Sequence, residues 1–256
     1  MKNILFFDVD GTLYNSQKEL PKSAKEAIFA ARANGHEVAI ATGRAPFMIE
    51  ALLEELEIDT YVTFNGQYVV YKGEVIFTDS IPTDQLEEII RYGEQRNHPV
   101  VFIDDRKMIA SVEGNRAIQD SLDTLFYPYP QLKQDFYKQN PVYQTLLFIE
   151  EHEQAQYEER FPNVRFVRWH EKSCDMLPRE GSKARGIEKL LERANIPMER
   201  AIAFGDGLND IEMLQAVGTG VAMGNGREEV IKVADVLAGH VDQDGLYHVM
   251  KKLDLF

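Results

Sequence analysis

The segment ILFFDVDGTL at positions 4–13 constrains the fold most, because an apolar run leads directly into two carboxylates. Four consecutive apolar residues before Asp8 are typical of a central parallel strand that is covered on both faces. Gly11 follows Asp10 and allows the backbone to turn sharply. We therefore predict that Asp8 and Asp10 lie at the carboxyl end of a strand, where open α/β sheets bind their ligands.

The chemistry available to this pair of carboxylates is narrow. Asp8 and Asp10 repel each other, so both stay ionised at neutral pH only when a cation or a hydrogen-bond donor neutralises them. Mg²⁺ suits this task because it takes oxygen ligands, binds few carboxylates and retains several waters. With the metal bound, one carboxylate could attack phosphorus while the other moves a proton. A turn that carries solvated acids is the less favoured alternative for the pair by itself.

The next segments predict a right-handed βαβ unit with a parallel sheet. Apolar residues at helical spacing occupy positions 21–34, and an apolar strand pattern follows at positions 37–41. Thr42, Gly43 and Arg44 come next, before a helix predicted for positions 46–56. Hydroxyl, backbone N–H and guanidinium groups in such a turn can bind phosphate oxygens, although a helix cap with a surface arginine has the same sequence.

The pattern changes after position 81. Before it, a hairpin is predicted at positions 68–77, and Asn65 and Gly66 are interpreted as a turn, with substrate contact as the alternative. Between positions 82 and 181, short helices alternate with strands. This pattern predicts a separate α+β domain at 82–181, inserted between two parts of the first domain at 1–81 and 182–256.

The parallel pattern returns after Gly181. Ser182 is predicted to cap a helix that extends to about position 195, which places Lys183 in the first helical turn. A cation is disfavoured there by the helix dipole, so either an anion lies nearby or the lysine is simply solvated.

A third polar group follows another short apolar strand pattern, at positions 201–205. Asp206, Asn209 and Asp210 could complete a metal site begun by Asp8 and Asp10 if this strand lies beside the first one. An Asx-rich turn that caps the next helix is the alternative. The later stretch 224–226, with sequence GNG, is interpreted as a tight turn in preference to a phosphate-binding nest.

Composition excludes several classes of protein. A net charge of −14 argues against a nucleic-acid partner, which would need a basic surface, but not against small anions near a bound metal. Cys174 is the single cysteine, so no internal disulfide can form, and the six histidines show no metal-ligand spacing. No apolar run approaches a membrane span or a signal peptide. We therefore expect a cytoplasmic protein without a membrane or nucleic-acid partner, and the oligomeric state stays open.

Four separated motifs, Asp-x-Asp-Gly-Thr, Thr-Gly-Arg, Lys and Gly-Asp-x-x-Asn-Asp, follow one another in this order. Together they resemble the haloacid dehalogenase (HAD) superfamily, and within it the Cof-type sugar-phosphate phosphatases. The resemblance spans nearly the whole chain and is strongest in the motifs. It implies an α/β fold with a doubly wound parallel sheet, the HAD-like Rossmannoid core, and assigns the 82–181 insertion to a C2-type α+β cap domain.

The resemblance also implies a reaction. Asp8 would attack phosphorus to form an aspartyl phosphate, and Asp10 would protonate the leaving alcohol and later activate water. Mg²⁺ would be bound by Asp8, the backbone carbonyl of Asp10 and Asp206, with Asp210 and Asn209 in support. The residues that would contact the phosphate or substrate are Thr42, Gly43, Arg44, Lys183 and Asn209, with Arg44 facing either the substrate or a structural acid.

The expected activity is thus Mg²⁺-dependent hydrolysis of small phosphorylated metabolites, with the cap closing over the site. A phosphosugar mutase and a phospho-acceptor regulator are the alternatives, although Asp10 and the large insertion disfavour the regulator. Sugar phosphates, pyridoxal phosphate and a phosphorylated riboflavin precursor are all compatible substrates. Specificity is expected in the cap, where positions 104–108 and 169–175 are candidate regions, with a purely structural role as the alternative for both.

Overall fold

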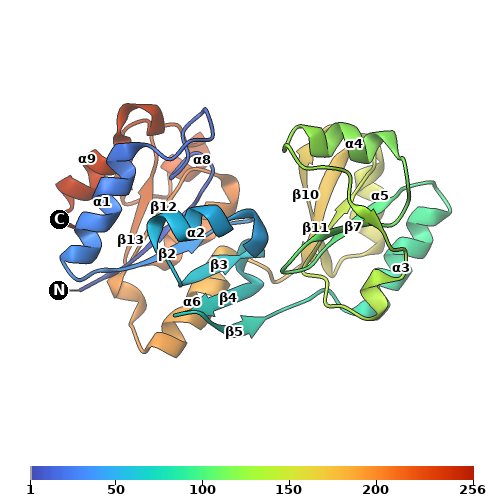
Figure 1. The fold of residues 1–256 in the computed structure, drawn as a ribbon, viewed down its shortest axis with the longest axis horizontal. Coiled ribbons are helices and arrows are strands. Elements are labelled where there is room, and N and C mark those ends of the chain that lie inside the picture. The colour runs from blue at the N-terminus through green and yellow to red at the C-terminus, as the bar shows by residue number, and fades with distance from the viewer. Residues whose placement is uncertain (1) are drawn as a thin grey trace. The chain divides into compact units, whose positions relative to one another are not determined.

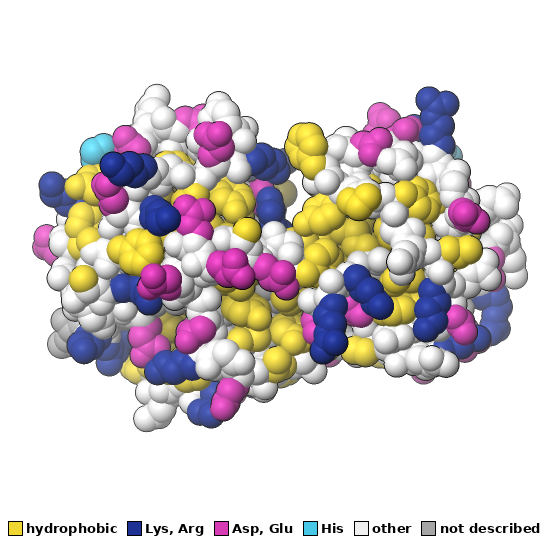
Figure 2. Space-filling view, in the orientation of Figure 1, with side chains coloured by type: hydrophobic (Ala, Val, Ile, Leu, Met, Phe, Trp, Pro, Cys, Tyr) yellow, Lys and Arg dark blue, Asp and Glu magenta, His cyan; other side chains and the backbone are white. Residues whose placement is uncertain are grey.

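The computed structural model describes residues 2–256 and separates into two compact units (Figure 1). The first unit comprises Met1–Arg44, Met48–Thr78 and Gly181–Phe256, and the second comprises Ala45–Phe47 and Asp79–Glu180. Among the described residues, no helix is long and apolar enough to cross a membrane. On the face shown in Figure 2, acidic and basic side chains are interspersed on both units.

The first unit is built on an eight-stranded sheet with the order β14-β13-β12-β1-β2-β3-β4-β5. The pairs from β14 to β3 are all parallel, and β3, β4 and β5 pair antiparallel. The strands are β1 (Ile4–Phe7), β2 (Glu37–Ala41), β3 (Tyr61–Thr63), β4 (Tyr68–Tyr71), β5 (Glu74–Thr78), β12 (Ala201–Gly205), β13 (Thr219–Ala222) and β14 (Val236–Leu237).

Helices cover both faces of this sheet. They are α1 (Lys22–Ala33), α2 (Glu50–Leu56), α6 (Lys183–Ala194), α7 (Ile211–Ala216), α8 (Glu228–Ile231) and α9 (Gly245–Lys252). Short 3₁₀ turns lie at Pro46–Met48, Phe64–Gly66, Met198–Arg200, Leu208–Asp210 and Val241–Gln243.

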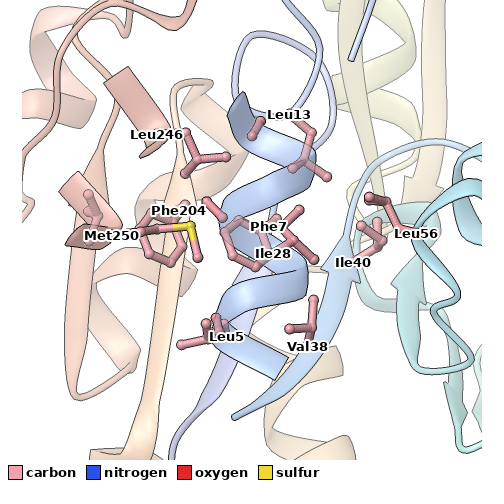
Figure 3. Close-up of a cluster of buried hydrophobic side chains, with 14 of the residues drawn as sticks. Leu5, Phe7, Leu13, Ile28, Val38, Ile40, Leu56, Phe204, Leu246 and Met250 are labelled. Atoms are coloured by element: carbon pink, nitrogen blue, oxygen red, sulfur yellow. The ribbon is translucent and has the colours of Figure 1, made fainter. Parts of the chain in front are cut away.

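Strand β1 shows why the sheet needs two helical layers. Leu5 and Phe7 point into one apolar cluster with residues of α1, α2 and α9, and part of this cluster is drawn in Figure 3. Ile4 and Phe6 point to the other face, into a cluster with residues of α6, α7 and α8. Because successive strand residues point to opposite faces, an unbroken apolar run requires burial on both sides.

The second unit contains a six-stranded sheet with the order β10-β11-β9-β6-β7-β8, antiparallel except for the pair β7 and β8. Residues of α3 and α5 join its own apolar cluster. The strands are β6 (Val100–Ile103), β7 (Met108–Ala110), β8 (Gln131–Leu132), β9 (Gln144–Leu147), β10 (Val164–His170) and β11 (Ser173–Pro178). The helices are α3 (Thr83–Glu94), α4 (Arg116–Asp123) and α5 (Gln154–Arg160), with 3₁₀ turns at Phe136–Lys138 and Glu151–Glu153.

The predicted fold class, a doubly wound parallel sheet with an inserted α+β part, is confirmed. One predicted helix differs in detail. The segment 46–56 forms a 3₁₀ turn and the separate helix α2, because Ile49 between them has φ −120° and ψ 4°, outside the helical region. Helix α9 was not predicted.

Candidate active site

Parallel pairing brings the polar ends of three strands to one edge of the first sheet. Phe7 in β1 lies opposite Ile40 in β2 and Phe204 in β12, so these strands end at nearly the same level. Asp8 follows β1 directly, and Asp206 follows β12 directly. The carboxylates of Asp8, Asp206 and Asp210 each place one oxygen within 4.8 Å of the other two.

Lys183 lies against this acidic cluster with its side chain fully buried. Its Nζ donates to Oδ1 of Asp8 at 2.6 Å and to Oδ1 of Asp210 at 2.5 Å. The side chain of Ser182 caps α6 by accepting a hydrogen bond from the backbone N–H of Arg185. Two carboxylates of the chain itself are therefore the anions that stabilise this lysine in the first turn of the helix.

Burial controls the charge states in this cluster. Desolvation raises the pKa of Asp8 to about 8, with Lys183 opposing the shift and Asp210 adding to it. Burial likewise raises the pKa of Asp206 to about 6. Desolvation alone would lower the pKa of Lys183, but Asp210 and Asp8 outweigh it and raise that pKa above its usual value. The lysine is thus charged, and the carboxylates need further positive charge to ionise fully.

The loop after β12 is organised by Asp210, whose side chain is fully buried. Its Oδ2 accepts hydrogen bonds from the backbone N–H groups of Asp206 at 2.9 Å and Gly207 at 2.8 Å. Thr12 donates from Oγ1 to Oδ1 of Asp206 at 2.9 Å. Gly11, with φ +84°, leaves room for the Asp206 carboxylate, because a Cβ there would overlap it. These contacts fix the direction of the Asp206 side chain.

Asp10 does not join the acidic cluster with its side chain. Arg44 donates to both of its oxygens, from Nε at 2.8 Å and from an Nη at 2.7 Å. Lys18 adds a contact at 3.2 Å. Burial opposes ionisation of Asp10, but Arg44 and Lys18 outweigh it and lower its pKa. The sequence left open whether Arg44 faces the substrate or an acid of the chain. In the structure Arg44 contacts an acid of the chain, Asp10.

Thr42 and Asn65 connect the second strand to this region. Thr42 is buried, and its Oγ1 accepts a hydrogen bond from the backbone N–H of Arg44 at 3.2 Å. The backbone N–H of Asn65 donates to the carbonyl of Thr42, and the Asn65 side chain accepts from Nδ2 of Asn209 at 2.9 Å. Gly43 lies next to Asn65, and a Cβ there would crowd the Asn65 amide. Asn65 therefore links the turn after β2 to the turn after β12.

The GNG turn provides another link that the sequence analysis missed. Nδ2 of Asn225 donates to the carbonyl of Gly11 at 2.8 Å, and its Oδ1 accepts from the backbone N–H of Val241. The backbone N–H groups of Gly224 and Gly226 donate to main-chain carbonyls, as a tight turn requires. Thr12 and Lys18 were also missed, since a threonine after a glycine or a loop lysine carries no local signal of its partner.

The donor set fits a hard divalent cation. Three carboxylates supply closely spaced oxygens at the carboxyl ends of parallel strands, and oxygen is the ligand that such cations prefer. The raised pKa values of Asp8 and Asp206 show a deficit of positive charge that a cation would meet.

Comparisons with known proteins agree on one family. The model of the haloacid dehalogenase-like hydrolases matches residues 5–250. The chain is 39% identical over 252 residues to YkrA of Bacillus subtilis strain 168, covering 98% of each chain. A solved structure of a protein from Geobacillus kaustophilus HTA426 has a TM-score of 0.97 and 44% identity over 100% of both chains. The HAD subclass IIB sugar phosphatase BT4131 has a TM-score of 0.86 and 31% identity over 100% of both chains.

Proposed function

The chain belongs to the haloacid dehalogenase-like hydrolases and is a phosphatase of that superfamily, and from this premise we propose its reaction in detail. The protein hydrolyses small phosphorylated metabolites, such as sugar phosphates, with Mg²⁺ and through an aspartyl phosphate. The observation that carries this proposal is the convergence of Asp8, Asp206, Asp210 and Lys183 at one sheet edge. The net charge of −14 favours a small substrate over a nucleic acid.

The metal would be held by the side chains of Asp8 and Asp206 and the backbone carbonyl of Asp10. Asp210 supports this set through Lys183 and the loop amides that it binds. When bound, Mg²⁺ supplies positive charge that neutralises the phosphoryl oxygens during transfer.

The remaining steps belong to side chains of the chain. A carboxylate oxygen of Asp8 attacks phosphorus, while Lys183 and Thr42 bind phosphoryl oxygens, with Gly43 and Asn209 beside them. Asp10 gives its proton to the leaving alcohol as the bond from phosphorus to that oxygen breaks. Asp10 then takes a proton from water, which attacks the phosphorus of the aspartyl phosphate and releases phosphate and free Asp8. In this structure Arg44 contacts both oxygens of Asp10 and lowers its pKa, so Asp10 must leave this contact before it carries the proton that it donates.

Replacing Asp10 by Asn should separate the two halves of this reaction. p-Nitrophenolate leaves without protonation, so p-nitrophenyl phosphate should still phosphorylate Asp8, whereas hydrolysis of the intermediate should slow by about 10²- to 10⁴-fold. Rapid-quench kinetics should then show a burst of about one p-nitrophenol per protein chain, followed by slow turnover. With a ³²P-labelled phosphate ester as substrate, the aspartyl phosphate should appear as label that stays on the protein in acid and is removed by hydroxylamine.

Three outcomes would contradict this mechanism. Unchanged steady-state turnover in Asp10→Asn would remove Asp10 from catalysis. In the wild type, an isomerised sugar phosphate in place of free phosphate would indicate a mutase. A phosphorylated wild-type chain that persists for hours would indicate a phospho-acceptor regulator.

Mg²⁺ should raise the melting temperature, and the shift should be larger at pH 8 than at pH 6. The pKa of Asp8 is raised to about 8 and that of Asp206 to about 6, so these carboxyls hold protons that a cation must displace. Raised carboxyl pKa values also mean that the metal-free fold loses stability as pH rises from about 4 to about 8, and the cation offsets that loss.

Thermal unfolding with and without Mg²⁺ measures this effect. Asp206→Asn should remove most of the shift, whereas Asp254→Asn, an exposed change outside the site, should retain it. A shift of equal size at both pH values, or one retained in Asp206→Asn, would argue against this metal site.

A further inference from the structure

Asn225 lies in the turn that follows β13, at the same edge of the first sheet as Asp206. Strand β13 pairs in parallel with β12, and Ala222 at the end of β13 lies opposite Gly205 at the end of β12. The turns that follow the two strands are therefore neighbours. The side chain of Asn225 is partly buried, so its polar atoms need partners within the protein.

The two glycines of this turn bring Asn225 close to Asp206. The backbone N–H of Gly224 donates to the carbonyl of Gly239 at 2.9 Å. A Cβ on Gly224 would lie 2.8 Å from the backbone of Gly239, and a Cβ on Gly226 would lie 3.3 Å from Cα of Asp206. Because glycine has no Cβ, the turn packs closely against both neighbouring loops, and this packing fixes the backbone of Asn225.

The side-chain amide of Asn225 makes two hydrogen bonds of opposite kind. Its Nδ2 donates to the carbonyl of Gly11 at 2.8 Å, and its Oδ1 accepts from the backbone N–H of Val241 at 2.9 Å. Nδ2 also lies 3.5 Å from Oδ2 of Asp206, at the limit of a hydrogen bond. A carboxylate could not donate and an alkyl group could neither donate nor accept, so the position suits an amide.

Gly11 is the residue of the loop after β1 where such a contact has the largest effect. Its φ is +84°, and glycine has the widest choice of backbone conformations. The backbone N–H of Gly11 donates to the carbonyl of Tyr14 at 3.1 Å, which holds the peptide between Asp10 and Gly11. Asn225 holds the next peptide through the carbonyl of Gly11. Because each peptide group is planar, the carbonyl of Asp10 then keeps one direction.

We infer that Asn225 is a positioning residue for the metal ion, and this inference rests on the proposed phosphatase function. Its hydrogen bond to Gly11 sets the direction of the carbonyl of Asp10, and its Nδ2 lies against the carboxylate of Asp206. Both of these groups belong to the set that would hold Mg²⁺. Removing a group that orients metal ligands typically lowers metal affinity by about 10- to 100-fold.

Asp242 provides a comparison with a purely structural hydrogen bond. Its Oδ1 accepts from the backbone N–H of Ser16 at 2.9 Å, so it also joins the loop after β1 to the turn Val241–Gln243. Asp242 is exposed, and its side-chain contacts among the described residues are with Ser16 and His240. Asp242→Ala should therefore loosen the same two segments without changing the groups that would hold the metal.

Thermal unfolding across a range of Mg²⁺ concentrations, without substrate, measures the affinity of each variant for the ion. Asn225→Ala and Asn225→Leu should each bind Mg²⁺ roughly 10- to 100-fold more weakly than the wild type. Leucine keeps the approximate volume of asparagine but makes neither hydrogen bond, so equal losses in both variants indicate the amide and not packing. Asp242→Ala should bind Mg²⁺ within about threefold of the wild type, because an exposed charge is screened.

Kinetics with p-nitrophenyl phosphate provide a second readout. The Mg²⁺ concentration for half-maximal rate should rise in Asn225→Ala by the same factor as the loss of affinity. At saturating Mg²⁺ the KM for the ester should stay within about threefold of the wild type, because the altered contacts orient metal ligands and not the groups assigned to the phosphate.

Unchanged Mg²⁺ affinity in both Asn225 variants would overturn the inference. An equal loss of affinity in Asp242→Ala, or a wild type that binds no Mg²⁺, would overturn it as well. A wild type that binds Mg²⁺ but hydrolyses no phosphate ester would instead remove the proposed function, and the measured affinities would still decide whether Asn225 positions the ion.

Discussion

Asp8→Asn should abolish turnover, with a fall in kcat on the order of 10⁴-fold or more, as is usual when a nucleophile is removed. An amide has no charge and does not attack phosphorus at a useful rate. The change also removes one of the carboxylates that would hold Mg²⁺. Release of phosphate from p-nitrophenyl phosphate at saturating Mg²⁺ measures the loss.

Asp8→Asn should nevertheless fold normally. Lys183 keeps its contact with Asp210, and the neutral amide removes repulsion from Asp210 and Asp206 that raises the Asp8 pKa. The melting temperature without Mg²⁺ should therefore stay close to that of Asp254→Asn, which makes the same carboxylate-to-amide change at an exposed position. Activity retained in Asp8→Asn, in protein free of contaminating phosphatase, would exclude the aspartyl-phosphate mechanism.

Much of the first sheet could be predicted because the relevant signals are local. Each buried strand is a short apolar run, and its polar end residue follows directly, as Asp8 follows β1 and Asp206 follows β12. In a parallel sheet the ends of such strands share one edge, so the grouping of these residues follows from strand order alone. Helix α9 was missed although Leu246, Val249 and Met250 have helical spacing, because it is short and begins at a glycine.

The partners of the polar side chains could not be predicted in the same way. Arg44 binds Asp10, 34 positions away, and Asn209 binds Asn65, 144 positions away. Local sequence limits these residues to turns, but register and side-chain direction decide which groups meet.

Lys183→Met should destabilise the protein by about 3–5 kcal/mol and remove its activity. Breaking a buried ion pair leaves uncompensated charge in a desolvated place, which costs more than the pair itself contributes. Lys183 is fully buried and contacts two carboxylates, so its loss leaves Asp8 and Asp210 facing each other without a cation. Urea unfolding without Mg²⁺ measures the free energy of unfolding. Lys189→Met, a change at a partly exposed position on the same helix, should alter it by less than about 0.5 kcal/mol.

Two further measurements distinguish lost charge pairing from lost packing as the cause of the destabilisation in Lys183→Met. In Lys183→Met the uncompensated carboxylates should bind protons, so part of the lost stability should return when the pH is lowered from 8 to 6. Adding Asp210→Asn to Lys183→Met should also recover part of the loss, because it removes one of the unpaired carboxylates. Activity should stay absent in the double variant, since no lysine contacts Asp8 or binds the phosphoryl oxygens. A Lys183→Met protein as stable as Lys189→Met would show that the lysine does not hold these carboxylates together.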